Sequence, residues 1–313
     1  MTIIDKSNPF PAKIKERSLL NKAGSTKQTY HLVLDIKGSN LTFKPGDSIG
    51  VIPQNAPERV ADALRTLNAN PEDPIVDPRS QQSMTMLEYL THKVNLARLP
   101  AFAPLLPRFY SVASSPNTHP DEIHLLVALL QGGVASPFLC QAAELESTPI
   151  PIYLQPAHTF FLPQNPETHI IMIGPGTGIA PFRAFMQDRL HTQSPGKNWL
   201  FFGERNRASD FFYEDFWTAL AAENRLRLDL AFSRDQEEKC YVQHQMYQQS
   251  KELWDWIQEG AHIYVCGDKE KMAKDVDATL QKIAVEQGNL SPEDARLYVR
   301  GLRTQKRYLL DVY

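Results

Sequence analysis

Hydrophobic and polar positions follow different patterns in the two halves of the chain. In the first half, short apolar runs are separated by turns rich in proline and glycine, as in an antiparallel barrel or sandwich. Five such runs predict strands: "TYHLVLDI" (29–36), "KPGDSIGVI" (44–52), "RFYSVASS" (108–115), "EIHLLVALL" (122–130) and "TPIPIYLQ" (148–155). Between 54 and 106 the apolar spacing becomes three and four residues, as in "PERVADALRTL" and "MTMLEYLTHKV", which predicts a short helical insertion.

In the second half, the apolar runs are uninterrupted, as in parallel strands buried on both faces. These runs are "HIIMIG" (169–174), "NWLFFGE" (198–204), "LRLDLAFS" (226–233) and "HIYVCGD" (262–268). Helical patterns lie at 180–190, 211–222, 242–258 and 272–287, and Ser291 followed by Pro292 predicts the start of a last helix before the terminal strand "KRYLLDVY". We therefore predict a barrel domain at 1–165 and a doubly wound α/β domain at 166–313.

Charge and composition narrow the function. The net charge of -3 argues against nucleic-acid binding through a general basic surface. The N-terminal residues lack a secretory signal, and no apolar stretch is long enough to span a bilayer. The three cysteines are far apart and, with the histidines, form no metal-ligand spacing. We expect a soluble cytoplasmic protein without metal, membrane or nucleic-acid partner.

A glycine-rich turn joins the first strand of the α/β half to its first helix. It contains Gly174, Gly176, Thr177 and Gly178, whose spacing departs from the G-x-G-x-x-G dinucleotide fingerprint. A helix N-terminus preceded by small residues offers free N–H donors and a positive dipole end to an anion. The loop is therefore a candidate phosphate site, and the alternative is a plain strand-to-helix turn.

A second candidate site follows the third strand of the α/β half, in "FSRDQEEKCYVQ". It supplies Ser233, Arg234, Lys239, Tyr241 and Gln243, of which the last three alternate and would share one face of an extended segment. Cations and hydroxyls suit the 2′-phosphate of NADP, whereas a site for NAD presents an acid to the ribose. The alternative is a solvated charged loop.

Two stretches of the barrel half are candidates for holding a flat ring and its phosphates. "RFYS" carries Arg108, Phe109, Tyr110 and Ser111, and "GVAS", ahead of a short helix, carries Gly133, Val134, Ala135 and Ser136. An ordinary barrel strand and turn is the alternative.

A G-x-S-x-G match at 46–50 would place a hydrolase nucleophile at Ser48, but no helix pattern follows that serine, so we do not expect catalysis there.

Taken in order, these stretches resemble the FAD- and NADPH-binding module of the diflavin reductases, and within them the flavoprotein components of NADPH-dependent sulfite reductases. The resemblance runs from about Pro45 to Tyr313 and is densest from "NPETHIIMIGPGTGIAPFRAFMQDR" to "RYLLDVY". It implies an antiparallel FAD-binding barrel followed by an NADP-binding domain, as in ferredoxin–NADP reductases. Three departures are a shorter helical insertion, no room for the family's flavodoxin-like FMN domain, and Leu126-Val127-Ala128 where the family has a small, polar triplet that contacts FAD.

The resemblance also implies roles for individual residues. On the FAD side, the residues at 108–111 hold the phosphate with Arg108, the isoalloxazine with Tyr110 and N5 with Ser111, while those at 133–136 hold the pyrophosphate. On the NADP side, the loop at 174–178 holds the pyrophosphate, and the 2′-phosphate and adenine contact Ser233, Arg234, Lys239, Tyr241, Gln243 and Asp275. Cys266 lies near the nicotinamide, and Asp311 and Tyr313 supply an acid and an aromatic lid on the flavin.

The function that follows is an NADPH-dependent reductase in which hydride passes from NADPH to FAD. Ser111, Cys266, Asp311 and Tyr313 are the expected catalytic residues. A separate protein would then take the electrons: the haem subunit of a sulfite reductase, a flavodoxin or a ferredoxin. A general NADPH–flavodoxin/ferredoxin reductase and a non-enzymatic scaffold derived from a reductase remain alternatives.

Overall fold

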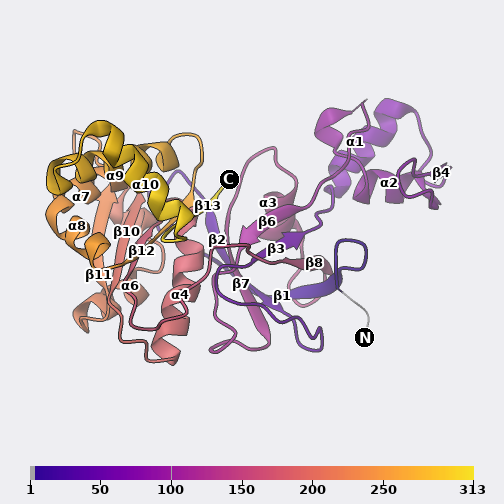
Figure 1. The fold of residues 1–313 in the computed structure, drawn as a ribbon. Helices are drawn as coiled ribbons and strands as arrows, with labels where there is room; N and C mark the ends of the chain where they lie inside the picture. The colour runs from indigo at the N-terminus through magenta and orange to yellow at the C-terminus, as the bar shows by residue number, and fades with distance from the viewer. Residues whose placement is uncertain (1–3, 100) are drawn as a thin grey trace.

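The computed structural model describes residues 4–99 and 101–313 and has the expected architecture of a barrel, a helical insertion and an α/β domain. The barrel lies in the middle, with the insertion on one side and the α/β domain on the other (Figure 1). The C-terminus lies between the α/β domain and the barrel (Figure 1).

The barrel is one antiparallel sheet in the order β6-β3-β8-β1-β2-β7. Its strands are β1 (Phe10–Leu19), β2 (Thr29–Asp35), β3 (Ser48–Val51), β6 (Arg108–Ser111), β7 (Glu122–Ala128) and β8 (Ile150–Gln155). A bridge between Val112 and Leu125 brings the end of β6 beside β7 and closes the sheet. The five predicted strands are confirmed. Strand β1 was not predicted, although its buried residues Ala12 and Ile14 alternate with charged ones.

The helical insertion contains α1 (Pro57–Leu67), a small hairpin of β4 (Pro74–Val76) and β5 (Ser83–Thr85), α2 (Met86–His92) and the short 3₁₀ helix η1 (Leu96–Arg98). Proline at its first position starts α1, and Asn68 ends it in a left-handed conformation. A capping box between Thr85 and Glu88 starts α2. Val60, Ala63 and Leu90 form a small core of the insertion's own.

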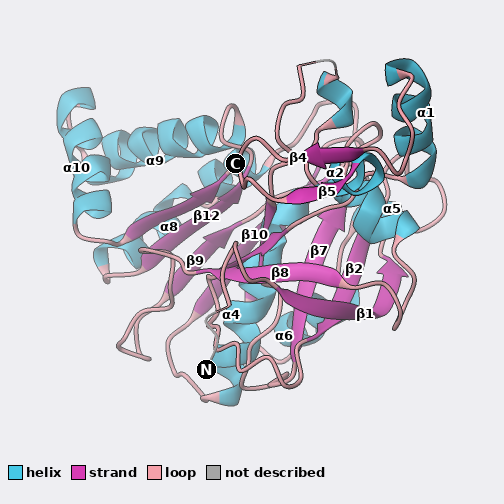
Figure 2. Cartoon of the chain, turned by 90° about the vertical axis from the view of Figure 1, so that its right-hand side faces the viewer, coloured by secondary structure: helices cyan, strands magenta, loops and turns pink. Residues whose placement is uncertain are grey.

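The α/β domain is built on a parallel sheet in the order β11-β10-β9-β12-β13 (Figure 2). Its strands are β9 (Ile170–Ile173), β10 (Asn198–Glu204), β11 (Arg227–Phe232), β12 (His262–Gly267) and β13 (Tyr308–Val312). Its helices are η3 (Gly176–Ile179), α4 (Ala180–His191), α5 (Arg207–Asp210), α6 (Glu214–Ala222), α7 (Val242–Gln248), α8 (Ser250–Gln258), α9 (Met272–Gly288) and α10 (Pro292–Thr304). The predicted helix at 242–258 is thus divided into α7 and α8 at Gln249.

The two faces of the parallel sheet pack into separate cores. Helices α7 to α10 cover one face, and α4 and α6 cover the other. The second core continues into the barrel through Ala113, Leu126 and Phe160, so apolar packing joins the two domains. Because both sides of this junction are close-packed, the relative position of the domains is fixed by many side chains at once.

Histidines gather where the barrel meets the α/β domain. His31 on β2 and His124 on β7 are buried, with ring centroids 4.9 Å apart, and His31 Nδ1 lies 2.8 Å from the Tyr213 hydroxyl. Glu122 interacts with His124 Nε2 and is paired with Lys15. Burial, and then the nearby Arg183, lower the pKa of His31 to about 3. Burial likewise lowers the pKa of His124 to about 4, against its contact with Glu122.

Acidification should therefore destabilise the protein between pH 6.5 and about 4. Below pH 6.5 the unfolded chain protonates His31 and His124 but the folded chain does not, so the free energy of unfolding falls as the pH falls. Each histidine lowers the free energy of unfolding by at most about 1.4 kcal/mol per pH unit. Over the 1.5 pH units from pH 6.5 to 5, the two histidines together lower it by at most about 4 kcal/mol. Urea unfolding at several pH values measures this slope. His124→Gln should flatten it and His158→Gln, at an exposed position, should not.

Candidate functional site

The glycine-rich loop at 174–178, the predicted nucleotide loop, lies at the carboxyl end of β9, the central strand of the parallel sheet. Gly176 has a φ of 60°, which favours glycine. A Cβ on Gly178 would lie 2.0 Å from the Cys266 carbonyl oxygen, so only glycine lets the loop approach β12 this closely. The chain crosses to opposite sides of β9 to form its two neighbours, and ligands bind at such a switch point in open α/β sheets.

A pocket of about 520 Å³, called the nucleotide pocket below, opens beside this loop, and most of the predicted NADP-binding residues line it. It is lined by Ser233, Arg234, Lys239, Tyr241, Gln243 and Asp275 together with Gly176. The expectation that Lys239, Tyr241 and Gln243 share an extended segment is wrong. Since α7 begins at Val242, Gln243 lies in its first turn, where its Nε2 donates to Asp275 Oδ2 at 3.2 Å. Helix winding, rather than strand alternation, turns Gln243 towards the pocket.

Several charged residues of this pocket were not predicted from the sequence. Lys271 and Arg205 come from the loops after β12 and β10, Glu204 is the last residue of β10, and Lys27 comes from the barrel. Lys27 forms an ion pair with the almost fully buried Glu204 carboxylate. No local pattern marks Lys27, because it reaches the pocket only through the packing of the two domains. With Arg234 and Lys239, these side chains give the pocket more cations than carboxylates.

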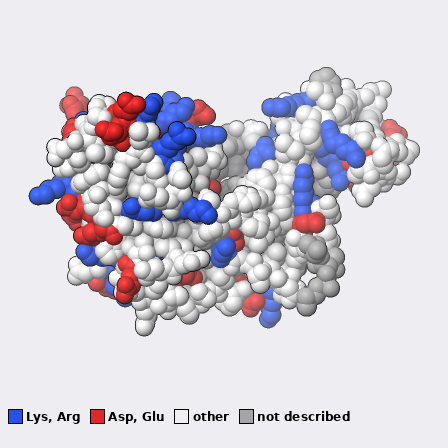
Figure 3. Space-filling view, viewed as in Figure 1, with Lys and Arg blue, Asp and Glu red and all other residues white. Residues whose placement is uncertain are grey.

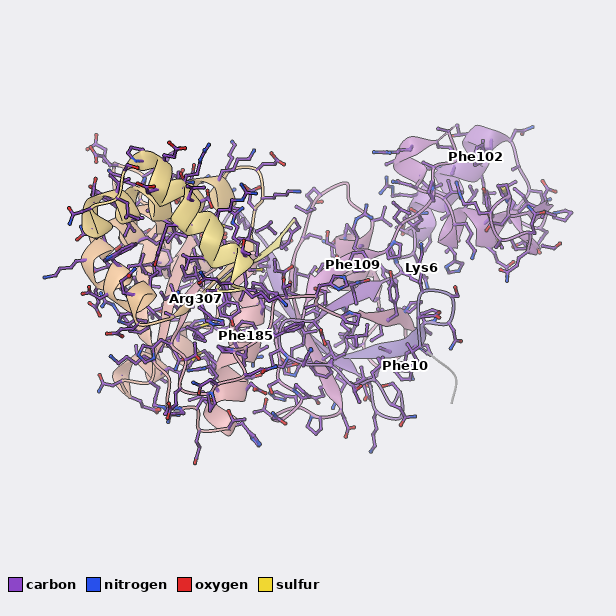
Figure 4. All side chains as sticks on the ribbon, in the orientation of Figure 1. Lys6, Phe10, Phe102, Phe109, Phe185 and Arg307 are labelled. Atoms are coloured by element: carbon purple, nitrogen blue, oxygen red, sulfur yellow. The ribbon has the colours of Figure 1, made fainter. Side chains whose placement is uncertain are left out.

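The predicted flavin element forms the edge strand β6. The exposed Arg108 donates to the backbone carbonyls of Leu106 and Pro107, and it forms no ion pair within residues 4–99 and 101–313. Tyr110 is half-buried, whereas Phe109, labelled in Figure 4, is 54% exposed. The Phe109 ring packs edge-on against Tyr153. Strand alternation therefore puts the Phe109 ring on the face opposite Arg108 and Tyr110.

The predicted pyrophosphate element lies at the start of α3 (Ala135–Pro137), which runs into the π-helical turn η2 (Phe138–Ala142). Gly133 and Val134 line a pocket of about 760 Å³ between the barrel and the insertion. Arg59 also lines it and donates to the Gly133 carbonyl at 3.3 Å. Ala135 and Ser136 are buried, and the Ser136 hydroxyl accepts from the Leu130 N–H at 3.0 Å, so this serine shapes the turn.

Five of the predicted catalytic and loop residues converge where the barrel meets the carboxyl ends of β12 and β13. The Ser111 hydroxyl donates to Asp311 Oδ2 at 2.6 Å, and Cys266 Sγ lies 3.6 Å from the same oxygen. Burial, and then the Asp311 carboxylate, raise the pKa of the Cys266 thiol, which therefore stays protonated. The Tyr313 hydroxyl lies 2.8 Å from Thr177 Oγ1 in the nucleotide loop.

The donor set fits the cofactors expected from the sequence. For NADPH, the glycine loop leaves no room for a Cβ at Gly178, and Arg234 and Lys239 form no ion pair with any residue that the structure describes. For FAD, Arg108 offers an exposed guanidinium, and Tyr110 and the 65% exposed Tyr313 offer rings. Tyr313 also lines a pocket of about 690 Å³ with Thr177 and Leu130, which links the nucleotide loop to the barrel.

Two other chemistries have less support. Ser48 begins β3 and pairs with Ser111 and Gln155, so it lies in a strand and not at a nucleophile elbow. His119, Glu122 and His124 lie close enough to ligate a metal, a grouping that the sequence spacing did not reveal. None of the helices in the described part of the chain is both long and apolar enough to cross a membrane.

Two family models match the chain. Residues 3–100 match the model of an FAD binding domain, and residues 172–278 match that of an oxidoreductase NAD-binding domain. The first covers the start of the barrel and most of the insertion, and the second covers the nucleotide loop and pocket.

Several curated proteins are similar to nearly the whole chain. They include the sulfite reductase [NADPH] flavoprotein alpha-components of Bacillus subtilis (38% identical), Mannheimia succiniciproducens (36%) and Escherichia coli O9:H4 (36%), each over 98% of this chain. The chain spans only 61–62% of the length of these relatives. The alignment to the Bacillus subtilis protein covers 373 positions, so that relative has residues within the aligned region that this 313-residue chain lacks.

Proposed function

We propose that the chain is an FAD- and NADP-binding module of the diflavin reductase family, which oxidises NADPH and passes the electrons through FAD to a separate protein. In support, the chain matches models of an FAD binding domain and an oxidoreductase NAD-binding domain and is 36–38% identical to sulfite reductase flavoproteins. The observation that carries the proposal is the convergence of Ser111, Cys266 and Asp311 beside the nucleotide loop. Ser111 comes from the predicted flavin strand, and the other two come from the ends of β12 and β13. The residues that would hold the two cofactors therefore meet at one point.

The cofactors supply the redox chemistry, in which hydride passes from the nicotinamide C4 to the flavin N5. The chain orients the two rings and excludes water between them. The Ser111 hydroxyl donates its hydrogen to Asp311. Its oxygen lone pairs therefore point away from that carboxylate and can accept a hydrogen bond. The protonated Cys266 thiol packs at the end of β12, and the Asp311 carboxylate favours the positive charge that develops on an oxidised nicotinamide.

A reconstituted sample tests this proposal. The chain should bind FAD stoichiometrically, and NADPH should bleach the flavin absorbance under anaerobic conditions. Asp311→Asn should slow bleaching roughly 10- to 100-fold, which corresponds to a loss of about 1.4–2.7 kcal/mol of transition-state stabilisation. Affinity for 2′,5′-ADP, which lacks the nicotinamide, should not change. A protein that cannot take up FAD, or an FAD-loaded protein that NADPH does not bleach, would refute the proposal.

For the acceptor, we propose a protein with an acidic docking face. The supporting observation is that Lys and Arg side chains occupy both sides of the hollow between the α/β domain and the insertion (Figure 3). The relatives are named as alpha-components of a sulfite reductase, so a haem-containing sulfite reductase partner is the specific proposal. Electron-transfer assays with that partner, a flavodoxin and a ferredoxin would distinguish it from a general reductase. Equal rates with all three would favour the general reductase.

A further inference from the structure

Helix α4 holds the segment that follows the predicted flavin strand β6. Arg183 Nη1 donates to the Ala113 carbonyl at 2.7 Å, and Gln187 Oε1 accepts from the Ser115 N–H at 3.0 Å. The Ser115 hydroxyl donates to Asp188 Oδ1 at 2.8 Å. Side chains spaced by four residues share a helix face, so one face of α4 binds this segment over a full turn.

Both ends of this connection belong to the proposed site. Helix α4 begins directly after the nucleotide loop, on the barrel side of the α/β domain (Figure 1). Ala113 lies two residues beyond Ser111, whose hydroxyl faces Asp311. The bond between Arg183 and Ala113 therefore joins the element that would hold the nucleotide to the element that would hold the flavin.

The surroundings of Arg183 indicate that it orients the segment around Ala113 rather than adding to the stability of the fold. Its guanidinium lies against the Tyr213 ring (5.0 Å) and the Phe216 ring (5.9 Å), and Nη1 lies 3.3 Å from His124 Nδ1. Within the described residues, no carboxylate forms an ion pair with it. Placing an unpaired cation here carries a desolvation cost, whereas the rigid guanidinium fixes the direction of its bond to Ala113.

The same contacts argue against the nearby metal grouping. His119, Glu122 and His124 have ligand atoms within 4.8 Å of one another. However, an Arg183 N–H points at His124 Nδ1, so that histidine carries its proton on Nε2, the atom that faces Glu122. A cation there would displace that proton while facing Arg183 and Lys15.

We propose that Arg183 is a positioning residue that sets the separation between the nicotinamide and the flavin, without contributing to nucleotide affinity. This rests on the proposed function. Apart from Lys27, the residues that line the nucleotide pocket come from the α/β domain and do not include Arg183. Loss of the Ala113 bond should therefore let the segment at 113–118, and with it the end of β6, shift while the pocket itself stays intact.

The test compares Arg183→Gln with two further variants. Arg183→Lys keeps the positive charge and a hydrogen-bond donor but loses the rigid, planar guanidinium, so it should restore the activity only in part. Arg189→Gln is the matched control, since Arg189 is a buried arginine of the same helix whose bonds to Asn198, Thr168 and Gly196 stay within the α/β domain.

In Arg183→Gln, hydrogen exchange at 113–118 should accelerate, and flavin reduction by NADPH should slow roughly 10- to 100-fold, since misplacement by about 1 Å has effects of this size. The primary isotope effect with C4-deuterated NADPH should rise, and binding of 2′,5′-ADP should stay within about twofold of the parent value. Arg189→Gln should leave the exchange at 113–118 and the isotope effect unchanged.

Three results would overturn the proposal. One is unchanged exchange in Arg183→Gln, and another is faster exchange with no change in the reduction rate or isotope effect. The third is a loss of 2′,5′-ADP affinity that matches the loss of rate. If Arg183→Gln does not fold, the same comparisons apply to Arg183→Lys. Failure of the parent protein to be reduced by NADPH would instead refute the proposed function, and the exchange measurement would still report on the contact.

Discussion

Replacing Arg234 with Ala is expected to weaken NADPH binding tenfold or more and to leave NADH binding nearly unchanged. Arg234 lines the nucleotide pocket, and its backbone N–H donates to the Arg205 carbonyl at 2.8 Å, which fixes where the side chain begins. The exposed guanidinium forms no ion pair in the described part of the chain, so it is free to bind the 2′-phosphate. A charge-assisted hydrogen bond contributes about 1.5–3 kcal/mol, which corresponds to about tenfold or more in affinity.

Calorimetric titration with 2′,5′-ADP, NADP⁺ and NAD⁺ measures this effect. Arg300→Ala is the matched control, because Arg300 is an exposed arginine of the same domain on α10, away from the pocket. The control should keep the affinity for all three ligands. Equal losses for NADP⁺ and NAD⁺ in Arg234→Ala would show that the arginine acts on the fold of the loop and not on the 2′-phosphate.

Much of the architecture could be predicted because it depends on short-range patterns. The uninterrupted apolar runs identified β9 to β12, of which β9, β10 and β12 are buried almost throughout between two helical layers. Ser291 and Pro292 identified the start of α10, whose cap the structure confirms through the Asp294 N–H. These signals are local, since a cap or an alternating strand needs only a few neighbouring residues.

What could not be predicted depends on segments that meet only after folding. Lys27 precedes β2 in the barrel, yet it reaches the nucleotide pocket and forms an ion pair with Glu204. Arg183 was seen only as part of an apolar helical pattern, although its partner Ala113 lies 70 residues earlier in the chain. A residue's own neighbours in the sequence carry no information about such contacts. The expected extended segment at 239–243 was wrong for a related reason, because packing against α9 favours helix from Val242.

Removing the ring of Tyr313 is expected to raise NADH-driven flavin reduction about tenfold and to shrink the preference for NADPH. Tyr313 follows β13, and its backbone N–H donates to the Gly267 carbonyl at 3.2 Å, so the residue is tied to the end of β12. The residue is 65% exposed and lines the pocket that joins the nucleotide loop to the barrel. We expect this ring to cover the flavin in the place that the nicotinamide must take.

Displacement of the ring has an energetic cost that the nucleotide must offset. Stacking contributes about 0.5–1.5 kcal/mol beyond the buried area, and the bond to Thr177 adds about 0.5–1.5 kcal/mol. NADPH offsets this cost through its 2′-phosphate contacts, which NADH lacks, so the ring helps to reject NADH. Without the ring, oxidised NADP should also bind more tightly and leave more slowly.

Three variants separate the contributions of the ring and of the hydroxyl. Tyr313→Phe removes only the bond to Thr177 and should raise the NADH rate slightly, whereas Tyr313→Ser and deletion of Tyr313 remove the ring and should produce the full effect. Stopped-flow flavin reduction with both nucleotides gives the rates, and the flavin absorbance spectrum reports whether a ring has left its face. If Tyr313→Ser leaves both the NADH rate and the spectrum unchanged, the ring does not cover the flavin. The choice of NADPH then depends on the pocket around Arg234 alone, which the affinity loss in Arg234→Ala would measure independently.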